Sequence, residues 1–218
     1  KKRILGVSRV GLVNGLFATA SGIGGITIIE TYRSLSDSKL SLELTGKQGD
    51  VMKESMSVAK TVAWNLLTDS IQDDIRKGTP WGIHIHCPEA ATPKDGPSAG
   101  GAITIAILSQ IIGVQVNNEC AMTGEIDLNG SIHQIGGLES KLYGARAAGV
   151  RTVLIPEDNR KDYEKILNAK DTRIHENDPD FKVVLVSHIH QVIPYFLLFK
   201  EEEMGKYINS QRHLLTAV

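Results

Sequence analysis

The chain has 218 residues, of which 41% are hydrophobic and 22% charged, a composition that suits one globular domain with a substantial core. Its 24 lysines and arginines nearly balance 25 aspartates and glutamates, which excludes a global basic field for holding nucleic acid or an anionic membrane. Two cysteines are too few for a disulfide framework and are compatible with a reducing compartment.

The N-terminal part of the chain has the pattern of β-structure. Residues 4–20 are β-branched and apolar with interspersed glycines, and the glycine-rich stretch 21–25 turns the chain before a second strand at 26–31. This pattern predicts a hairpin, and its glycines predict a plain turn because no helix follows them as a phosphate-binding loop requires. Alternation over 40–44 predicts a third strand that ends at Gly46.

A helical pattern follows these strands. Apolar residues recur at three- and four-residue steps from Val51 to Ile75, which predicts one long amphipathic helix ended by Gly78 and Pro80. Residues 81–87 predict a short strand that leads directly into a loop rich in proline and glycine.

That loop, T-P-K-D-G-P-S-A-G-G at 92–101, places Ser98 at the start of an apolar helix predicted over 99–112. The first turn of a helix offers free N–H groups and the positive end of the dipole, which stabilise an anion forming beside the serine oxygen. Ser98 is therefore well placed for a nucleophile. An isolated serine at such a position more commonly serves only to cap the helix.

Helices and strands alternate in the second half of the chain. The patterns predict, in chain order, a hairpin over 120–135 with Asn129-Gly130 at its turn, a helix over 138–148, a strand over 150–156, a helix over 158–167, a strand over 182–187 and a helical remainder. Early strands followed by helix–strand alternation predict an α+β domain with mixed sheets, early β-hairpins and packed helices, without a clear internal boundary.

Lys141 is the second candidate functional residue. It shares the apolar stripe of the helix over 138–148 with Leu138, Leu142 and Ala145, so it points with the apolar face. Burial disfavours the ammonium form and lowers the pKa of a lysine, and a position in the first helical turn acts in the same direction. A neutral lysine is a usable general base for a serine hydroxyl. The alternative is a structural lysine, with its apolar stem buried and its ammonium group extended into solvent.

Several blocks of the sequence resemble the proteolytic domain of Lon proteases, in collinear order from about Gly11 to Phe196. They are T-G-K-Q-G-D-V-M-K-E-S at 45–55, H-I-H-C-P-E at 84–89, T-P-K-D-G-P-S-A-G at 92–100, M-T-G-E-I at 122–126, G-G-L-x-x-K at 136–141 and A-G-V-x-T-V-L-I-P at 148–156. The resemblance implies the Lon proteolytic-domain fold over 1–200, with 201–218 as a C-terminal helical tail of the same domain.

The resemblance also implies a function and site residues. The domain would be a serine endopeptidase that cleaves unfolded or threaded polypeptides, with Ser98 as nucleophile and Lys141 as its general base. Thr123 would hydrogen-bond and orient the lysine, and Asp95 would shape the serine loop. Backbone N–H groups of Ser98 and Ala99 are the candidates for the oxyanion hole. Because the base must be neutral, activity is predicted to rise through mildly alkaline pH.

Assembly and partners follow from the same resemblance. Lon-type domains form homo-hexameric rings that act in protein quality control on unfolded or damaged proteins, and we expect no membrane or nucleic acid to be bound by this domain. The residues contain no G-x-x-x-x-G-K-[ST], so ATP and Mg would serve an ATPase module upstream in the same polypeptide, and the domain itself is expected to need no cofactor or metal. The expected compartment is the cytoplasm, with the mitochondrial matrix or another organelle as the alternative.

The chain departs from the common family pattern at positions that leave the Ser98–Lys141 pair in place. These departures concern the substrate groove and the contacts between subunits, and they are Gln48, Cys87, Ala90, His133, Gln134, Glu139 and Ser140.

Two other functions remain open at this level. The H-I-H pairs at 84–86 and 188–190 could contribute to a zinc site, although no C-x-x-C or H-E-x-x-H accompanies them. A non-catalytic Lon-like scaffold for oligomerisation or peptide binding is the stronger competitor. The joint presence of Ser98, Lys141 and Thr123 argues against the scaffold.

Overall fold

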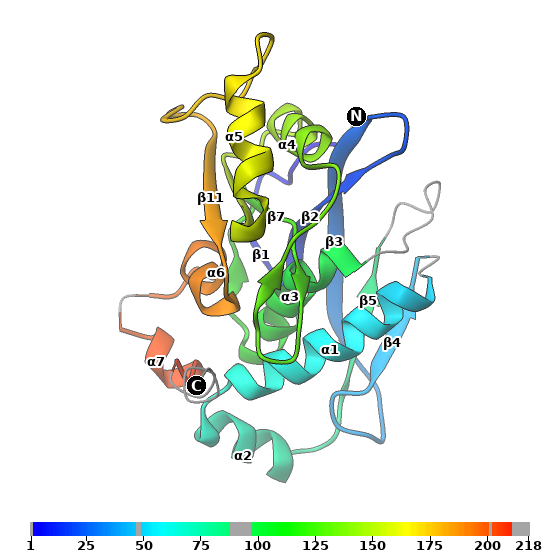
Figure 1. Ribbon diagram of the computed structural model, residues 1–218. Coiled ribbons are helices and arrows are strands. Elements are labelled where there is room, and N and C mark those ends of the chain that lie inside the picture. The colour runs from blue at the N-terminus through cyan, green and yellow to red at the C-terminus, as the bar shows by residue number, and fades with distance from the viewer. Residues whose placement is uncertain (1, 47–48, 88–96, 201, 211–218) are drawn as a thin grey trace.

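A seven-stranded mixed sheet with helices packed on both faces forms the centre of the molecule (Figure 1). The computed structural model describes residues 2–46, 49–87, 97–200 and 202–210. The strand order in the sheet is β11-β10-β7-β2-β3-β5-β4, and two further two-stranded sheets are β1-β6 and β8-β9. The predicted mixed α and β class is confirmed.

The elements have the following bounds. The strands are β1 (Arg9–Val10), β2 (Leu12–Ala18), β3 (Gly24–Ser34), β4 (Leu42–Thr45), β5 (Gly82–His86), β6 (Gln115–Val116), β7 (Cys120–Met122), β8 (Glu125–Ile126), β9 (Ile132–His133), β10 (Thr152–Pro156) and β11 (Lys182–Val186). The helices are α1 (Asp50–Leu66), α2 (Asp69–Lys77), α3 (Gly100–Ile112), α4 (Leu138–Ala147), α5 (Arg160–Asn168), α6 (Ile189–Phe196) and α7 (Met204–Tyr207), with short 3-10 turns at Pro97–Ala99 and Glu157–Asn159.

The predicted N-terminal hairpin is present as β2 and β3. They pair antiparallel from Leu12 opposite Glu30 to Ala18 opposite Gly24. β7 lies parallel to both β2 and β10, so the carboxyl ends of three neighbouring strands reach the same edge of the sheet. This edge is where loops and helix ends from both faces can meet.

The two faces of the sheet are buried in separate hydrophobic clusters. One contains side chains of α1, α3 and α6, and the other contains side chains of α4 and α5. In β10, Leu154 belongs to the first cluster, whereas Val153 and Ile155 belong to the second, as the alternation of a strand requires. Each isoleucine or leucine fully buried in this way stabilises the fold by about 1.5–3 kcal/mol.

The prediction of one long helix over residues 51–75 is wrong. The chain forms α1 and α2, separated at Leu67, whose backbone is extended with φ −73° and ψ 148°. The C-terminal segment causes the break: Leu67 forms a β-bridge with Ile208, and the N–H of Thr68 donates to the carbonyl of Tyr207 at 3.0 Å. Because this partner is distant in sequence, the apolar periodicity alone could not reveal the break.

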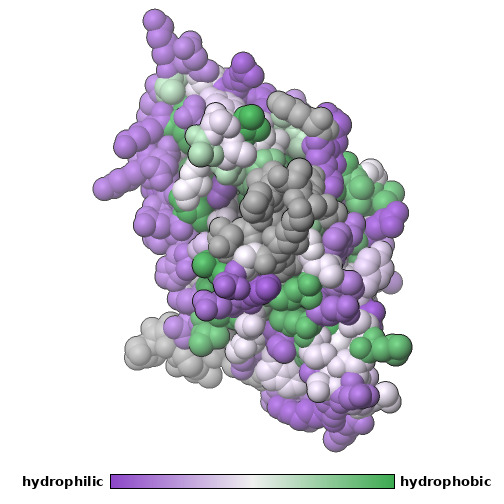
Figure 2. Space-filling model, turned by 90° about the vertical axis from the view of Figure 1, so that its right-hand side faces the viewer, coloured by the Kyte–Doolittle hydropathy of each residue, from purple (hydrophilic) through white to green (hydrophobic). Residues whose placement is uncertain are grey.

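The surface of the described residues carries scattered apolar side chains. On the face drawn in Figure 2, the hydrophobic residues form small groups separated by hydrophilic ones. The large hydrophobic residues with the greatest exposure are Leu35, Leu128, Tyr32 and Ile23. No helix within the described ranges is both long enough and apolar enough to span a membrane.

Candidate active site

Ser98 lies in the 3-10 turn Pro97–Ala99, directly before α3. Ala99 is the N-cap of α3 and makes no side-chain capping hydrogen bond, and the Ser98 hydroxyl makes no hydrogen bond with the described part of the chain. The half-buried serine therefore occupies the N-terminal end of a buried helix without acting as its cap.

The serine turn is fixed by Gly124, which sequence reasoning did not single out. The predicted strand over 120–128 is divided into β7 and β8, with Thr123 and Gly124 between them. The Gly124 N–H donates to the carbonyl of Ser98 at 2.8 Å, and its carbonyl accepts from the N–H of Gly101 at 3.0 Å. A glycine inside a strand pattern was the available signal for such a close backbone contact.

Lys141, in α4, contacts the dipeptide Thr123–Gly124. Its Nζ donates to Thr123 Oγ1 at 3.1 Å. Lys141 is 5% exposed and Thr123 is 0% exposed, the orientation expected from the apolar stripe of this helix. Burial lowers the pKa of Lys141 to about 8, because the ammonium form loses its hydration. A substantial neutral fraction is therefore present at mildly alkaline pH.

Two glycines place α4 against the start of β3. A Cβ on Gly24 would lie 1.8 Å from the carbonyl oxygen of Ser140, and a Cβ on Gly144 would lie 2.3 Å from the carbonyl carbon of Gly24. Only hydrogen atoms fit at these points, so the backbones are in direct contact one residue before Lys141. Gly24 was predicted to lie in the turn; it lies instead in β3, where its lack of a side chain allows this contact.

The arrangement brings Ser98 and Lys141 to one strand end from opposite faces of the sheet. Ser98 leads into α3 on one face, Lys141 belongs to α4 on the other, and Thr123 follows β7 between them. Within the described ranges, Ser98 and Lys141 share no direct hydrogen bond, and Thr123–Gly124 joins them. A serine at a helix N-terminus and a lysine of lowered pKa, joined through one dipeptide, are groups that nucleophilic acyl transfer can use.

The remaining sequence candidates lie outside this group. Asp95, Gln48 and Ala90 fall outside the described residues. Cys87 is buried at the end of β5, and its N–H donates to the carbonyl of Thr45 at 3.3 Å.

His133 and Gln134 are exposed beside the β8–β9 hairpin. His133 Nε2 lies 2.7 Å from Asp127 Oδ2, and the hydrogen bonds that Asp127 accepts lower the pKa of its carboxyl despite partial burial. This pair fastens the two strands of the hairpin together.

The two H-I-H pairs have structural partners. Thr45 Oγ1 lies 2.9 Å from His84 Nε2 and 2.6 Å from His86 Nδ1, which joins β4 to β5. The rings of His188 and His190 stack with centroids 5.0 Å apart at the start of α6. Across the residues that the structure describes, no three histidine, cysteine, aspartate or glutamate side chains are grouped to hold a metal ion.

Comparison with known proteins adds an independent observation. Residues 2–198 match the family model described as the Lon protease (S16) C-terminal proteolytic domain. A Lon protease homolog of Acanthamoeba polyphaga mimivirus is 44% identical over 189 residues, which cover 84% of this chain and 18% of the relative. Lon protease 1 of Bacillus subtilis is 41% identical over 192 residues, covering 87% of this chain and 23% of the relative.

An organellar relative is similar to the same degree. A Lon protease homolog of Phaeodactylum tricornutum, named as mitochondrial, is 41% identical over 187 residues, covering 81% of this chain and 21% of the relative. The chain thus spans about a fifth of the length of the curated relatives that it matches.

Proposed function

The chain belongs to the Lon protease (S16) family, as its C-terminal proteolytic domain, and from this premise we propose a serine endopeptidase with Ser98 as nucleophile and Lys141 as general base. The observation that carries the proposal is the buried hydrogen bond from Lys141 Nζ to Thr123, in the dipeptide whose Gly124 fastens the Ser98 turn. The lowered pKa of Lys141, about 8, supports the same role because a base must be neutral.

The proposed reaction is acyl transfer to Ser98 followed by hydrolysis. Neutral Lys141 accepts the hydroxyl proton while Ser98 Oγ forms a bond to the carbonyl carbon of the substrate peptide. The resulting oxyanion is stabilised by backbone N–H groups at the start of α3, with those of Ser98 and Ala99 as candidates. The lysine ammonium then gives its proton to the leaving amine, which breaks the peptide bond. Water, deprotonated by the same lysine, releases the acyl group.

Thr123 and Asp95 are proposed to support this chemistry. By accepting a hydrogen bond from Nζ, Thr123 fixes the direction of the lysine side chain and leaves the nitrogen lone pair free to face the serine. Asp95 is proposed, from the family resemblance alone, to shape the loop before Ser98.

The biological context is proposed from the relatives. Their names describe Lon proteases of bacterial, viral and mitochondrial origin, so the domain is proposed to act in the cytoplasm or in an organelle. We propose unfolded or damaged polypeptides as substrates, a homo-hexameric ring, and an ATPase module in the same polypeptide that uses ATP and Mg. Residues 201–218 are proposed to belong to the same domain as residues 1–200.

A labelling experiment tests nucleophile and base together. The protein is incubated with a peptide-like β-lactone at alkaline pH, and tandem mass spectrometry locates the adduct. We expect an ester on Ser98 in the parent protein, none in Ser98→Ala, and strongly reduced labelling in Lys141→Ala. Ser57→Ala and Lys161→Ala change exposed residues of the same types and should label like the parent.

The contrary result would have a clear meaning. An adduct that appears on other residues but not on Ser98, in folded protein at alkaline pH, would contradict the peptidase and favour the non-catalytic scaffold.

A further inference from the structure

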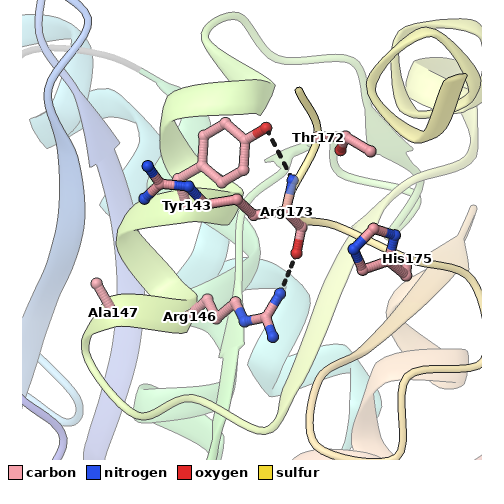
Figure 3. Close-up of a pocket in the computed structure, with 6 residues that line it drawn as sticks. All are labelled: Tyr143, Arg146, Ala147, Thr172, Arg173 and His175. Atoms are coloured by element: carbon pink, nitrogen blue, oxygen red, sulfur yellow. Dashed lines mark hydrogen bonds between the residues drawn. The ribbon is translucent and has the colours of Figure 1, made fainter. Parts of the chain in front are cut away.

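A pocket of about 460 Å³ lies beside α4, among residues that the proposed active site does not use (Figure 3). Its walls come from the second half of α4 and from the segment after α5. The lining residues are Tyr143, Arg146, Ala147, Thr172, Arg173 and His175.

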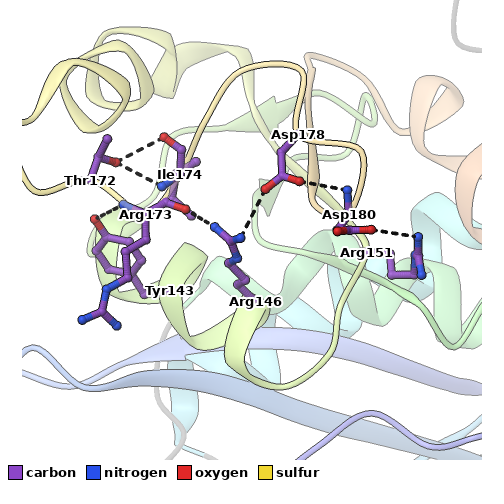
Figure 4. Close-up of polar contacts among 8 residues, drawn as sticks. All are labelled: Tyr143, Arg146, Arg151, Thr172, Arg173, Ile174, Asp178 and Asp180. Atoms are coloured by element: carbon purple, nitrogen blue, oxygen red, sulfur yellow. Dashed lines mark hydrogen bonds and ion pairs between the residues drawn. The ribbon is translucent and has the colours of Figure 1, made fainter.

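Hydrogen bonds fix the two walls relative to each other (Figure 4). The Arg146 guanidinium donates to the backbone carbonyl of Arg173, and its Nη2 lies 3.3 Å from Asp178 Oδ2. The N–H of Arg173 donates to the Tyr143 hydroxyl oxygen at 3.4 Å, which leaves the phenolic proton free to be donated elsewhere. These contacts hold the two walls of the pocket together.

The segment from Thr172 to His175 is also anchored to the hydrophobic core through Ile174. Ile174 is 1% exposed and packs in the cluster under α4, and Thr172 Oγ1 bonds to both the N–H and the carbonyl of Ile174 at 3.1 and 3.2 Å. Because Ile174 points inward, its exposed neighbours Arg173 and His175 are held at the surface of the pocket.

The lining of the pocket contains two arginines, Arg146 and Arg173. Besides Arg146 and Arg173, Arg3 donates to the carbonyl of Ala147 at 3.4 Å and so lies at the rim. Among the described residues, Asp178 is the only carboxylate that forms an ion pair with any of these three arginines, and its partner is Arg146. Within the described ranges, the Arg173 guanidinium and the His175 ring make no hydrogen bond or ion pair. Their N–H groups can therefore donate to a ligand.

We propose that this pocket binds a phosphate group, carried either by inorganic phosphate or by a small phosphate monoester. Phosphate accepts hydrogen bonds in several directions, which suits the arginine, histidine and tyrosine residues that line this pocket. A planar guanidinium also pairs with phosphate through two parallel hydrogen bonds. The pocket is larger than one phosphate group, so it has room for the organic part of an ester.

Titration of the folded protein tests this site without any measurement of peptidase activity. Sodium phosphate is added at constant ionic strength, with sodium chloride as the reference, and amide shifts are followed by NMR. We expect saturable shifts confined to Tyr143, Arg146 and the segment 172–175. Arg173→Gln should weaken binding about tenfold or more, because a charge-assisted hydrogen bond is lost. Lys165→Gln, an exposed change of the same charge on α5, should leave binding unchanged.

Two further ligands distinguish the sources of the phosphate. Adenosine monophosphate that binds more tightly than inorganic phosphate would support a monoester, whereas equal or weaker binding would support the free anion. Saturable binding of adenosine at this site would contradict phosphate recognition. Shifts equal in phosphate and chloride, or an Arg173→Gln/His175→Gln variant that binds phosphate like the parent, would overturn the proposal. None of these outcomes depends on Ser98, so the proposed peptidase activity stands or falls separately.

Discussion

Lys141 is buried and has no acidic partner among the described residues, and its ammonium form is therefore disfavoured in the folded protein. Its Nζ donates a hydrogen bond to the neutral hydroxyl of Thr123, and burial lowers its pKa to about 8. Below that pH the side chain is mostly protonated and cannot accept the Ser98 proton. We predict that kcat/KM for a peptide substrate rises about tenfold per pH unit below about pH 8 and levels above it. A profile that is flat across this range would contradict a lysine base.

The same lowered pKa predicts a stability effect. The pKa is 10.5 in the unfolded chain and about 8 in the folded protein, so between these values only the unfolded chain holds the proton. The free energy of unfolding therefore gains a contribution that increases as pH rises from 8 to 10.5, and the full penalty applies below pH 8. We predict that Lys141→Met stabilises the fold by about 1–3 kcal/mol at neutral pH, measured by urea unfolding, and strongly reduces labelling of Ser98.

The control for this effect is Lys161→Met, which alters an exposed lysine and should leave the free energy of unfolding within about 0.5 kcal/mol of the parent. Equal stability of Lys141→Met and the parent would show that burial of the ammonium costs little.

Thr123 is predicted to matter through its oxygen rather than its size. Thr123→Val keeps the shape but removes the acceptor for Lys141 Nζ, so we expect kcat to fall about tenfold with little change in KM. Thr123→Ser retains the hydroxyl and should recover most of the activity. If both variants behaved alike in steady-state kinetics, the hydrogen bond would have no positioning role.

Candidate site residues that carry chemical groups could be proposed from the sequence, whereas the partners of glycines that act by lacking a side chain could not. Ser98 and Lys141 stood out because a serine began a helix and a lysine shared an apolar stripe, and family resemblance added Thr123. Gly24 and Gly124 act through contacts with segments that are distant in sequence. A glycine inside a strand pattern indicates a close backbone contact at Gly124 but does not identify the partner, and no local pattern indicates the contact of Gly24 with α4.

At the scale of elements, the backbone contact between α4 and β3 fixes the position of Lys141 relative to the sheet. We predict that Gly24→Ala forces α4 outward, because its Cβ would lie 1.8 Å from the carbonyl oxygen of Ser140. The expected result is a loss of about 1–3 kcal/mol in unfolding free energy and weaker β-lactone labelling of Ser98. Gly6→Ala is the matched control, since a Cβ there meets no atom within 4 Å. Labelling of Gly24→Ala at the parental rate would contradict the positioning role.

Most elements were predictable because they depend on local periodicity. The β2–β3 and β8–β9 hairpins, α3 and α4 appear where turn residues and apolar spacing placed them. The joint between α1 and α2 was missed because it depends on hydrogen bonds with the segment around Tyr207. The division of β7 from β8 was missed because Thr123 and Gly124 leave the strand to contact α3 and α4.

On the scale of the whole molecule, the C-terminal segment is predicted to belong to the same cooperative unit as the sheet. Ile208 is 5% exposed in the first cluster, and the N–H of Asn209 donates to the carbonyl of Leu66 at 2.8 Å. We predict that Ile208→Ala lowers the free energy of unfolding by about 2–4 kcal/mol in a single urea transition. Leu198→Ala removes a leucine that is 46% exposed and should cost less. A separate early transition for the C-terminal segment would contradict one unit.

The separation of the two hydrophobic clusters also has a consequence for the newly made chain. The proposed nucleophile leads into a helix buried on one face and the proposed base belongs to a helix buried on the other, and both reach Thr123–Gly124 through β7. The two groups therefore come together only after β7 has docked between β2 and β10 and both layers have packed. A partly folded chain would therefore lack the pairing of Ser98 and Lys141 that we propose for peptide hydrolysis.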